Sequence, residues 1–244
     1  MASRPPPSGP ADRVVFIAGA TGGLGRAAAA AFAEAGDRVV LCGTDRDRLA
    51  GVAKDLGLAE SRWAAAVGNL ADPAGARAAA AAATDTFGRI DVLLHLVGGF
   101  AAGTPLVEVK AEEAQSMLDQ HVWTTINLIE AVVPGMVERG WGRVVAAATA
   151  AAVTAPAKSG PYAAAKAAQE VLLRSLAKEV SAAGLTVNLV GIRAIDEQHE
   201  RETAPSPKNV SWTTPEEIVA ALLFLCSDDA AAITGARIPL DGRT

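Results

Sequence analysis

The chain has 244 residues and a formal net charge of −5 at pH 7, which suits one large α/β domain or two small ones. Its two cysteines, Cys42 and Cys226, lie far apart in the sequence, which excludes a disulfide scaffold and a Cys-x-x-Cys site, so we expect no metal. The mild acidity without Lys/Arg runs argues against a nucleic-acid partner. No apolar stretch reaches the roughly 18 residues of a membrane span. Residues 1–12 predict a disordered, Pro-rich tail with no secretory signal, so we expect a cytoplasmic protein without a membrane partner.

Short apolar runs alternate with helical stretches along the chain. The predicted strands are residues 13–18, 38–42, 62–67, 90–97, 143–148, 185–190 and 236–240. The predicted helices are residues 24–36, 45–56, 73–87, 112–139, 161–183 and 215–227. This alternation indicates βαβ units, and right-handed crossovers favour a doubly wound, Rossmann-type parallel sheet of about seven strands. We expect one domain over residues 13–244, with the charged segment 191–214 as a loop that forms a lid beside the site.

A glycine-rich loop, Gly-Ala-Thr-Gly-Gly-Leu-Gly, spans residues 19–25 between the first predicted strand and helix. Glycines let a backbone turn tightly and approach a pyrophosphate, and the helix N-terminus supplies free N–H groups. Glycines also serve ordinary tight turns, but the place of this loop between strand and helix favours nucleotide binding. The cofactor-binding residues predicted here are Gly19, Thr21, Gly23, Leu24 and Gly25.

Tyr162 and Lys166 lie four residues apart at the start of a predicted helix, so their side chains share one face. An ammonium beside a phenol stabilises the phenolate and lowers the tyrosine pKa, which prepares the phenol for proton transfer near neutral pH. The spacing also occurs incidentally on helices. However, Tyr162 is the only tyrosine, and it follows the fifth strand, at the sheet edge where ligands bind in such folds.

Together these residues resemble the short-chain dehydrogenase/reductase family, over about residues 13–242. The loop is similar to the family's Thr-Gly-x-x-x-Gly-x-Gly motif, with Ala18 in place of the leading Thr, and Tyr162 and Lys166 match its Tyr-x-x-x-Lys motif. The resemblance implies an NAD(P)-dependent oxidoreductase that transfers a hydride between nicotinamide and a C=O or C=N group of a small substrate. It implies further cofactor contacts at Asn69, Leu70, Gly98 and Ile195. It also implies a homodimer or homotetramer, assembled through the helices at 112–139 and 161–183.

The sequence departs from the family pattern around the expected reaction centre. His121 stands at the position of the family's active-site Asn, and Thr149 at that of its Ser. The resemblance therefore implies that Thr149 orients the substrate oxygen and that His121 orders a water beside Lys166 or shuttles protons. His95 begins the segment that aligns with the Asn-Asn-Ala-Gly motif, and Ile192-Arg193 replaces Pro-Gly. Both histidines can also simply fill space or bond backbone carbonyls.

The end of the second strand bears on the choice between NAD and NADP. An acidic residue there would bond the adenosine ribose hydroxyls and reject a 2′-phosphate. Gly43 holds that position, which leaves room for a phosphate that Thr44, Arg46 or Arg26 could contact. If Asp45 folds back toward the ribose, NAD is preferred instead. We predict NADP, with NAD as the alternative.

Two other functions stay open at this stage. Short stretches around Gly98, Trp123 and Trp212 are similar to the dihydropteridine-reductase-like branch, whose substrate is a quinonoid pterin. The altered Asn, Ser and Pro-Gly positions also fit a member of the same fold that binds a nucleotide without redox chemistry. An apolar or aromatic substrate is suggested by Phe100, Leu106, Trp123 and Trp212, which we expect near the pocket.

Overall fold

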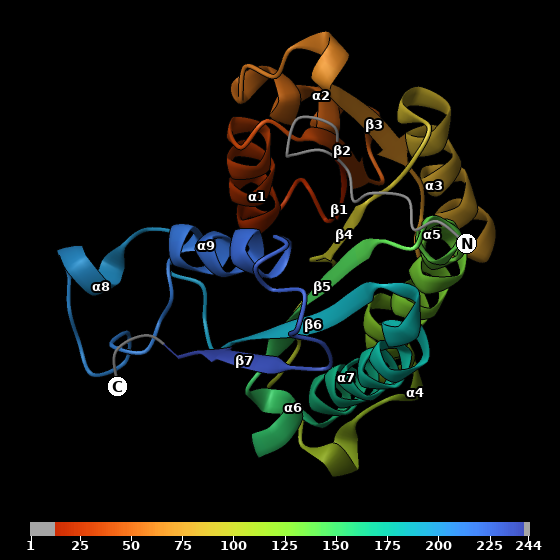
Figure 1. Cartoon of the computed structure of the whole chain (residues 1–244). Coiled ribbons are helices and arrows are strands. Elements are labelled where there is room, and N and C mark those ends of the chain that lie inside the picture. The colour runs from red at the N-terminus through yellow and green to blue at the C-terminus, as the bar shows by residue number, and fades with distance from the viewer. Residues whose placement is uncertain (1–12, 242–244) are drawn as a thin grey trace.

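The computed structural model describes residues 13–241, so the predicted tail over residues 1–12 lies outside the described residues. Seven parallel strands form one sheet in the order β3-β2-β1-β4-β5-β6-β7, which confirms the predicted doubly wound fold (Figure 1). The strands are β1 (Val14–Ala18), β2 (Arg38–Gly43), β3 (Trp63–Val67), β4 (Val92–His95), β5 (Gly142–Thr149), β6 (Leu185–Ile192) and β7 (Arg237–Leu240). Helices cover both faces, so β1, β4 and β6 are buried along their whole length.

Two helical layers sandwich the sheet (Figure 1). One layer contains α1 (Gly23–Glu34), α2 (Arg46–Asp55) and α9 (Pro215–Leu225), whose buried side chains share one core cluster. The other contains α3 (Pro73–Phe87), α5 (Thr124–Arg139) and α7 (Gly160–Val180). The shorter helices are α4 (Ala111–Leu118), α6 (Ala151–Thr154) and α8 (Glu200–Thr203). Within the described residues, no helix is long and apolar enough to cross a membrane.

The strand order places a topological switch point between β1 and β4, which are neighbours in the sheet although β2 and β3 separate them in the chain. Ligands bind at such a point, in the crevice outside the carboxyl ends of the strands. The glycine-rich loop follows β1 there, while β4 ends at His95 and β5 ends at Thr149. The fold therefore collects at one edge three segments that lie far apart in the sequence.

Two predicted elements differ from the structure. The helix predicted over 112–139 contains a π-helical segment, Asp119–Trp123, between α4 and α5. Such segments are rare and concentrate at functional sites. The segment 191–214 is not wholly a loop, because β6 extends to Ile192, α8 forms a single turn, and Ile195 makes a parallel bridge with Thr213.

Candidate active site

The glycine-rich loop is shaped by close approaches of the backbone. Gly19 has a φ of +91°, and a Cβ there would lie 3.0 Å from the carbonyl carbon of Leu96, just past β4. A Cβ on Gly25 would clash with the carbonyl oxygen of Gly19. These two positions thus accept only glycine, and they bring the start of α1 against the ends of β1 and β4.

Among the described residues, no side chain caps the N-terminus of α1 through a hydrogen bond. Its N-cap residue is Gly22, and the first turn holds no acidic residue. By contrast, α2, α3 and α9 are capped by the side chains of Asp45, Asp72 and Thr214. The first N–H groups of α1 therefore point out of the helix without a capping side chain, and they fit the pyrophosphate of a dinucleotide.

Tyr162 lies in the first turn of α7 and faces a pocket of about 560 Å³. Two rings pack edge-on against the phenol, that of Phe100 at a centroid distance of 5.0 Å and that of His121 at 5.5 Å. The buried Thr149 also lines the pocket and makes a hydrogen bond with Tyr162. The structure thus brings together Tyr162, Thr149 and His121, three residues predicted from sequence to act at one site.

The pocket lining corrects one expectation. Of the four residues taken as signs of an apolar or aromatic substrate, Phe100 lines the pocket, whereas Leu106, Trp123 and Trp212 are not among its lining residues. The charged residues Arg193 and Asp241 line it as well. The pocket is therefore not purely apolar, because the segments after β6 and β7 contribute these two charged side chains to its lining.

The predicted effect of Lys166 on the phenol is wrong in this structure. Burial raises the pKa of Tyr162, and only the hydrogen bond with Thr149 acts to lower it. The Lys166 ammonium instead donates to the carbonyl oxygen of Ala147 at 2.6 Å and to Gln169 Oε1 at 2.5 Å. Burial lowers the pKa of Lys166 to about 8, against a raising effect of the nearby Glu170 carboxylate. The group poised to titrate near neutral pH is therefore the lysine.

A buried polar network continues from Lys166 into the protein. The Gln169 amide nitrogen lies 3.1 Å from His95 Nε2 and 3.0 Å from Thr125 Oγ1. Because Lys166 donates to the amide oxygen of Gln169, the amide N–H groups face His95 and Thr125, and His95 Nε2 also lies 2.8 Å from Thr125 Oγ1. Thr125 Oγ1 in turn donates to the carbonyl oxygen of His121 at 2.6 Å. His95, at the end of β4, is thus part of a hydrogen-bonded cluster that fixes Lys166.

His121 lies in the π-helical segment and is buried against Gly98. A Cβ on Gly98, which has a φ of +138°, would clash with the imidazole ring. His121 Nε2 lies 3.0 Å from the carbonyl oxygen of Gly99. Burial and the charge of Lys166 lower the pKa of His121 to about 4, so the ring is neutral near pH 7. The neutral ring that donates from Nε2 leaves Nδ1 as an acceptor, and no described group pairs with this atom.

Comparison with known proteins identifies the family of this chain. The family model described as enoyl-(acyl carrier protein) reductase matches residues 19–242. The chain belongs to the short-chain dehydrogenase/reductase family. A 3-oxoacyl-(acyl-carrier-protein) reductase of Vibrio cholerae is 29% identical over 94% of this chain and 96% of its own. A D-threitol dehydrogenase of Mycolicibacterium smegmatis is 30% identical over 94% of this chain and 92% of its own. The crystal structure of levodione reductase matches with a TM-score of 0.86 and 27% identity, covering 95% of this chain and 96% of that one.

Membership of the short-chain dehydrogenase/reductase family makes the protein an NAD(P)-dependent oxidoreductase that acts on carbonyl substrates. The residues predicted to contact the adenosine end of the cofactor lie on the loops after β2 and β3. Thr44 is exposed after β2, and Asn69 is exposed after β3, where its side chain accepts from Ala71 N–H at 3.1 Å. Leu70 is buried beside it, and its carbonyl oxygen accepts from the buried Asn127 at 2.9 Å. Ile195 lies in the segment after β6, where it makes a parallel bridge with Thr213.

The residues that sequence reasoning missed come mostly from helix faces. Gln169 follows Lys166 by three residues and Thr125 follows His121 by four, so each shares a helix face with a predicted catalytic residue. That spacing was available in the sequence. Asn127 and Glu197 carry no such local signal, because their partners come from segments distant in the chain.

Acidification should destabilise the protein through His95. Burial and then the charge of Lys166 lower the pKa of His95 from 6.5 to about 3. The unfolded chain therefore binds a proton that the folded one does not, and stability falls as the pH drops below 6.5. At about 1.4 kcal/mol per pH unit, this group alone removes about 2 kcal/mol from the free energy of unfolding between pH 7 and pH 5.

Urea unfolding of the wild type and of His95→Asn at both pH values measures this effect, because asparagine does not titrate. The variant should lose about 2 kcal/mol less than the wild type on acidification. His121 titrates in both proteins and cancels in the comparison. Equal losses in the two proteins would show that His95 is not held neutral by its surroundings.

Proposed function

We propose that this protein transfers a hydride between NADP and a C=O or C=N group of a small substrate, with Tyr162 as the group that exchanges the proton. The observation that carries the proposal is the convergence of the Tyr162 and Thr149 hydroxyls on one pocket at the carboxyl edge of the sheet, beside the ends of β5, β6 and β7. A bound nicotinamide supplies or accepts the hydride at its C4. The protein's own side chains orient the substrate, bind the cofactor and exchange the proton.

Each of these side chains has a distinct role in the proposal. In the reducing direction Tyr162 donates its phenolic proton to the substrate oxygen or nitrogen, and Thr149 orients that atom by a hydrogen bond. Lys166 holds the nicotinamide ribose and returns a proton toward the phenol. Neutral His121, with its Nδ1 acceptor unpaired among the described groups, accepts a proton or orders a water beside the phenol.

The cofactor preference is argued from the loop after β2. Asp45 Oδ1 accepts from Asp47 N–H at 2.9 Å and Arg48 N–H at 3.1 Å, so this carboxylate oxygen caps α2. Thr44 and Arg46 are exposed beside it and offer a hydroxyl and a positive charge to a 2′-phosphate. Arg26 is paired with Asp55 at 2.8 Å. These contacts support NADP as the cofactor, bound through the glycine loop, Thr44, Asn69, Leu70, Gly98 and Ile195.

Titration with NADPH and with NADH, followed by nicotinamide fluorescence, tests the assignment. We expect saturable binding of both, tighter for NADPH. Arg46→Gln should weaken NADPH binding about tenfold and leave NADH binding unchanged, because it removes a positive charge proposed to contact the 2′-phosphate, which NADH lacks. Arg48→Gln, on the same exposed helix, is the matched control. An unchanged NADPH affinity in Arg46→Gln would contradict the NADP arrangement.

The substrate panel follows from the open alternatives. It includes small ketones, quinones and a quinonoid dihydropterin, the last because of the proposed kinship with dihydropteridine reductases. Stereospecifically deuterated cofactor that delivers its label to product would exclude the non-redox alternative, whereas binding without transfer to any compound would favour it. The homodimer or homotetramer expected from the sequence stays a prediction.

A further inference from the structure

The carboxyl group of Glu197 lies over the first residue of α1. The three atoms nearest to a Cβ built on Gly23 are the carboxyl carbon and both carboxyl oxygens of Glu197, close enough to clash with it. Glu197 belongs to the segment after β6, some 170 residues after Gly23 in the chain, so no local sequence pattern predicts the contact between them. A carboxylate therefore sits at the helix N-terminus that fits the cofactor pyrophosphate.

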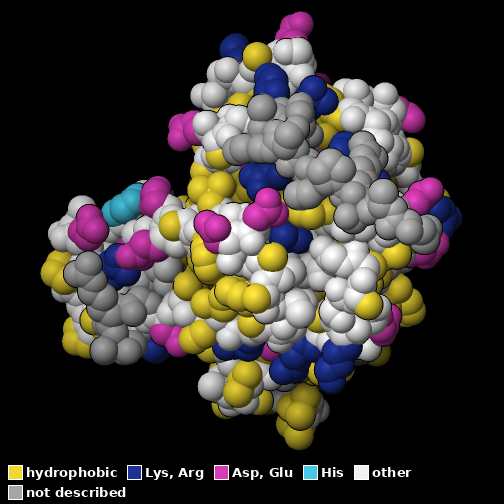
Figure 2. Space-filling model, viewed as in Figure 1, with side chains coloured by type: hydrophobic (Ala, Val, Ile, Leu, Met, Phe, Trp, Pro, Cys, Tyr) yellow, Lys and Arg dark blue, Asp and Glu magenta, His cyan; other side chains and the backbone are white. Residues whose placement is uncertain are grey.

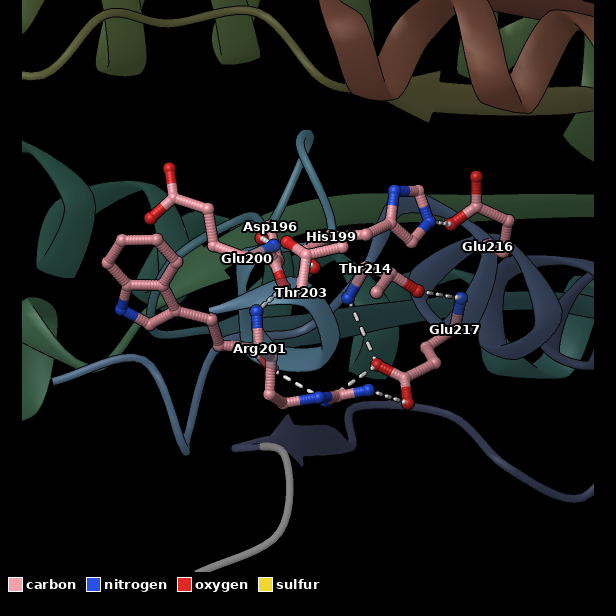
Figure 3. A network of polar contacts seen from close by, with 9 residues as sticks. Asp196, His199, Glu200, Arg201, Thr203, Thr214, Glu216 and Glu217 are labelled. Atoms are coloured by element: carbon pink, nitrogen blue, oxygen red, sulfur yellow. Dashed lines mark hydrogen bonds and ion pairs between the residues drawn. The ribbon is translucent and has the colours of Figure 1, made fainter. Parts of the chain in front are cut away.

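The backbone around Glu197 is fixed by its neighbours. Asp196 N–H donates to the carbonyl oxygen of Thr213 at 2.9 Å. The buried Asp196 carboxylate accepts from the backbone N–H groups of Glu200 at 2.8 Å and Arg201 at 2.9 Å (Figure 3). The position of Glu197 thus follows from a segment that is hydrogen-bonded on both sides of it.

The same segment is tied to α9 by a bidentate ion pair. Arg201 contacts the two carboxylate oxygens of Glu217 at 2.7 and 3.0 Å, and it also donates to the carbonyl oxygen of Trp212 at 2.7 Å (Figure 3). Glu217 in turn accepts from Thr214 N–H as part of the capping box of α9. Acidic side chains gather on the surface of this projecting part of the molecule (Figure 2). An anion that approaches the N-terminus of α1 therefore comes close to a negatively charged segment that is held in place by hydrogen bonds and an ion pair.

Charge explains why Glu197 favours this place. The N-terminus of α1 is the positive end of a helix dipole that has no acidic residue in its first turn and no capping side chain. Glu197 supplies the missing negative charge from outside the helix. A dinucleotide pyrophosphate bound at the N-terminus of α1 would bring two negative charges next to the Glu197 carboxylate, and like charges repel.

We propose that Glu197 is a resident competitor of the cofactor pyrophosphate and thereby sets the affinity of the protein for its dinucleotide. Binding requires the Glu197 carboxylate to leave the N-terminus of α1. The inference rests on the proposed dinucleotide binding, and it concerns a residue to which the proposed reaction gives no role.

Glu197→Gln removes the charge and keeps the size of the side chain. NADPH and NADH titrations at low ionic strength should show the variant binding both cofactors at least about tenfold more tightly than the wild type. Because salt screens like-charge repulsion, the advantage should shrink as NaCl is raised toward 1 M. Glu200→Gln is the matched control, since it removes the same charge from the same exposed segment without touching Gly23, and it should bind like the wild type.

The outcomes separate this inference from the proposed function. Equal affinities of the wild type and Glu197→Gln would overturn the role of Glu197 and leave the oxidoreductase assignment intact. The same gain in Glu200→Gln would also overturn it, because the effect would then be one of overall charge. Absence of binding in all three folded proteins would overturn both proposals. A gain confined to Glu197→Gln that fades with salt is the result that the structure predicts.

Discussion

Replacing Tyr162 with phenylalanine should lower turnover by about 10²–10⁴-fold, the contribution typical of a positioned general acid. The substitution removes only the hydroxyl that meets Thr149 in the pocket and keeps the ring that packs edge-on against Phe100 and His121. NADPH affinity should therefore stay within about twofold of the wild type, because the ring still fills its place. Steady-state turnover together with a fluorescence titration measures both effects.

Phe100→Leu is the control for ring packing in that experiment. It removes the partner ring of the phenol and leaves every hydroxyl of the site in place. We expect it to change the KM more than the kcat. Unchanged turnover in Tyr162→Phe would show that another group exchanges the proton, and neutral His121, whose Nδ1 has no partner among the described residues, would be the next to replace.

Replacing Lys166 with methionine should abolish the titration of activity near pH 8 and lower turnover at least about a hundredfold. Burial lowers the pKa of Lys166 to about 8, so the wild-type ammonium is charged below that pH and neutral above it. Reduction by the wild type should therefore fall as the pH rises through 8, because the charge and the proton are lost together. The variant has no group of this kind and should give a flat profile over the same range.

Lys178→Met is the matched control, since Lys178 is exposed on the same helix. Lys178→Met should have the same turnover and the same pH-profile midpoint as the wild type. In Lys166→Met, Gln169 Oε1 loses its donor, so a moderate loss of stability accompanies the kinetic effect. Urea unfolding separates the two, because stability does not set the midpoint of a pH profile. A midpoint near pH 8 that persists in Lys166→Met would assign the titration to another residue.

Much of the site was predictable because its residues lie in local patterns. A strand that leads directly into a helix beside a neighbouring strand needs a tight turn, and Gly19 and Gly25 permit that turn. The glycine positions in the sequence therefore predict the shape of the loop. The four-residue spacing of Tyr162 and Lys166 fixes a shared helix face in the same way. Thr149 and His121 joined them through the resemblance to a family, and the structure places both beside the phenol.

The sequence by itself determined the alternation of strands and helices and hence the parallel sheet, and it located the loop and the helix that we propose to carry the cofactor and proton chemistry. Only the tertiary structure decided what surrounds them. The buried Lys166 ammonium donates hydrogen bonds to the carbonyl oxygens of Ala147 and Gln169, because a buried charge needs polar partners. The pKa of the Tyr162 phenol rises because the effect of burial outweighs that of its one hydrogen bond. Glu197 reaches Gly23 from the far end of the chain. Burial and through-space electrostatics depend on segments that meet only when the chain is folded, so no local pattern reports them.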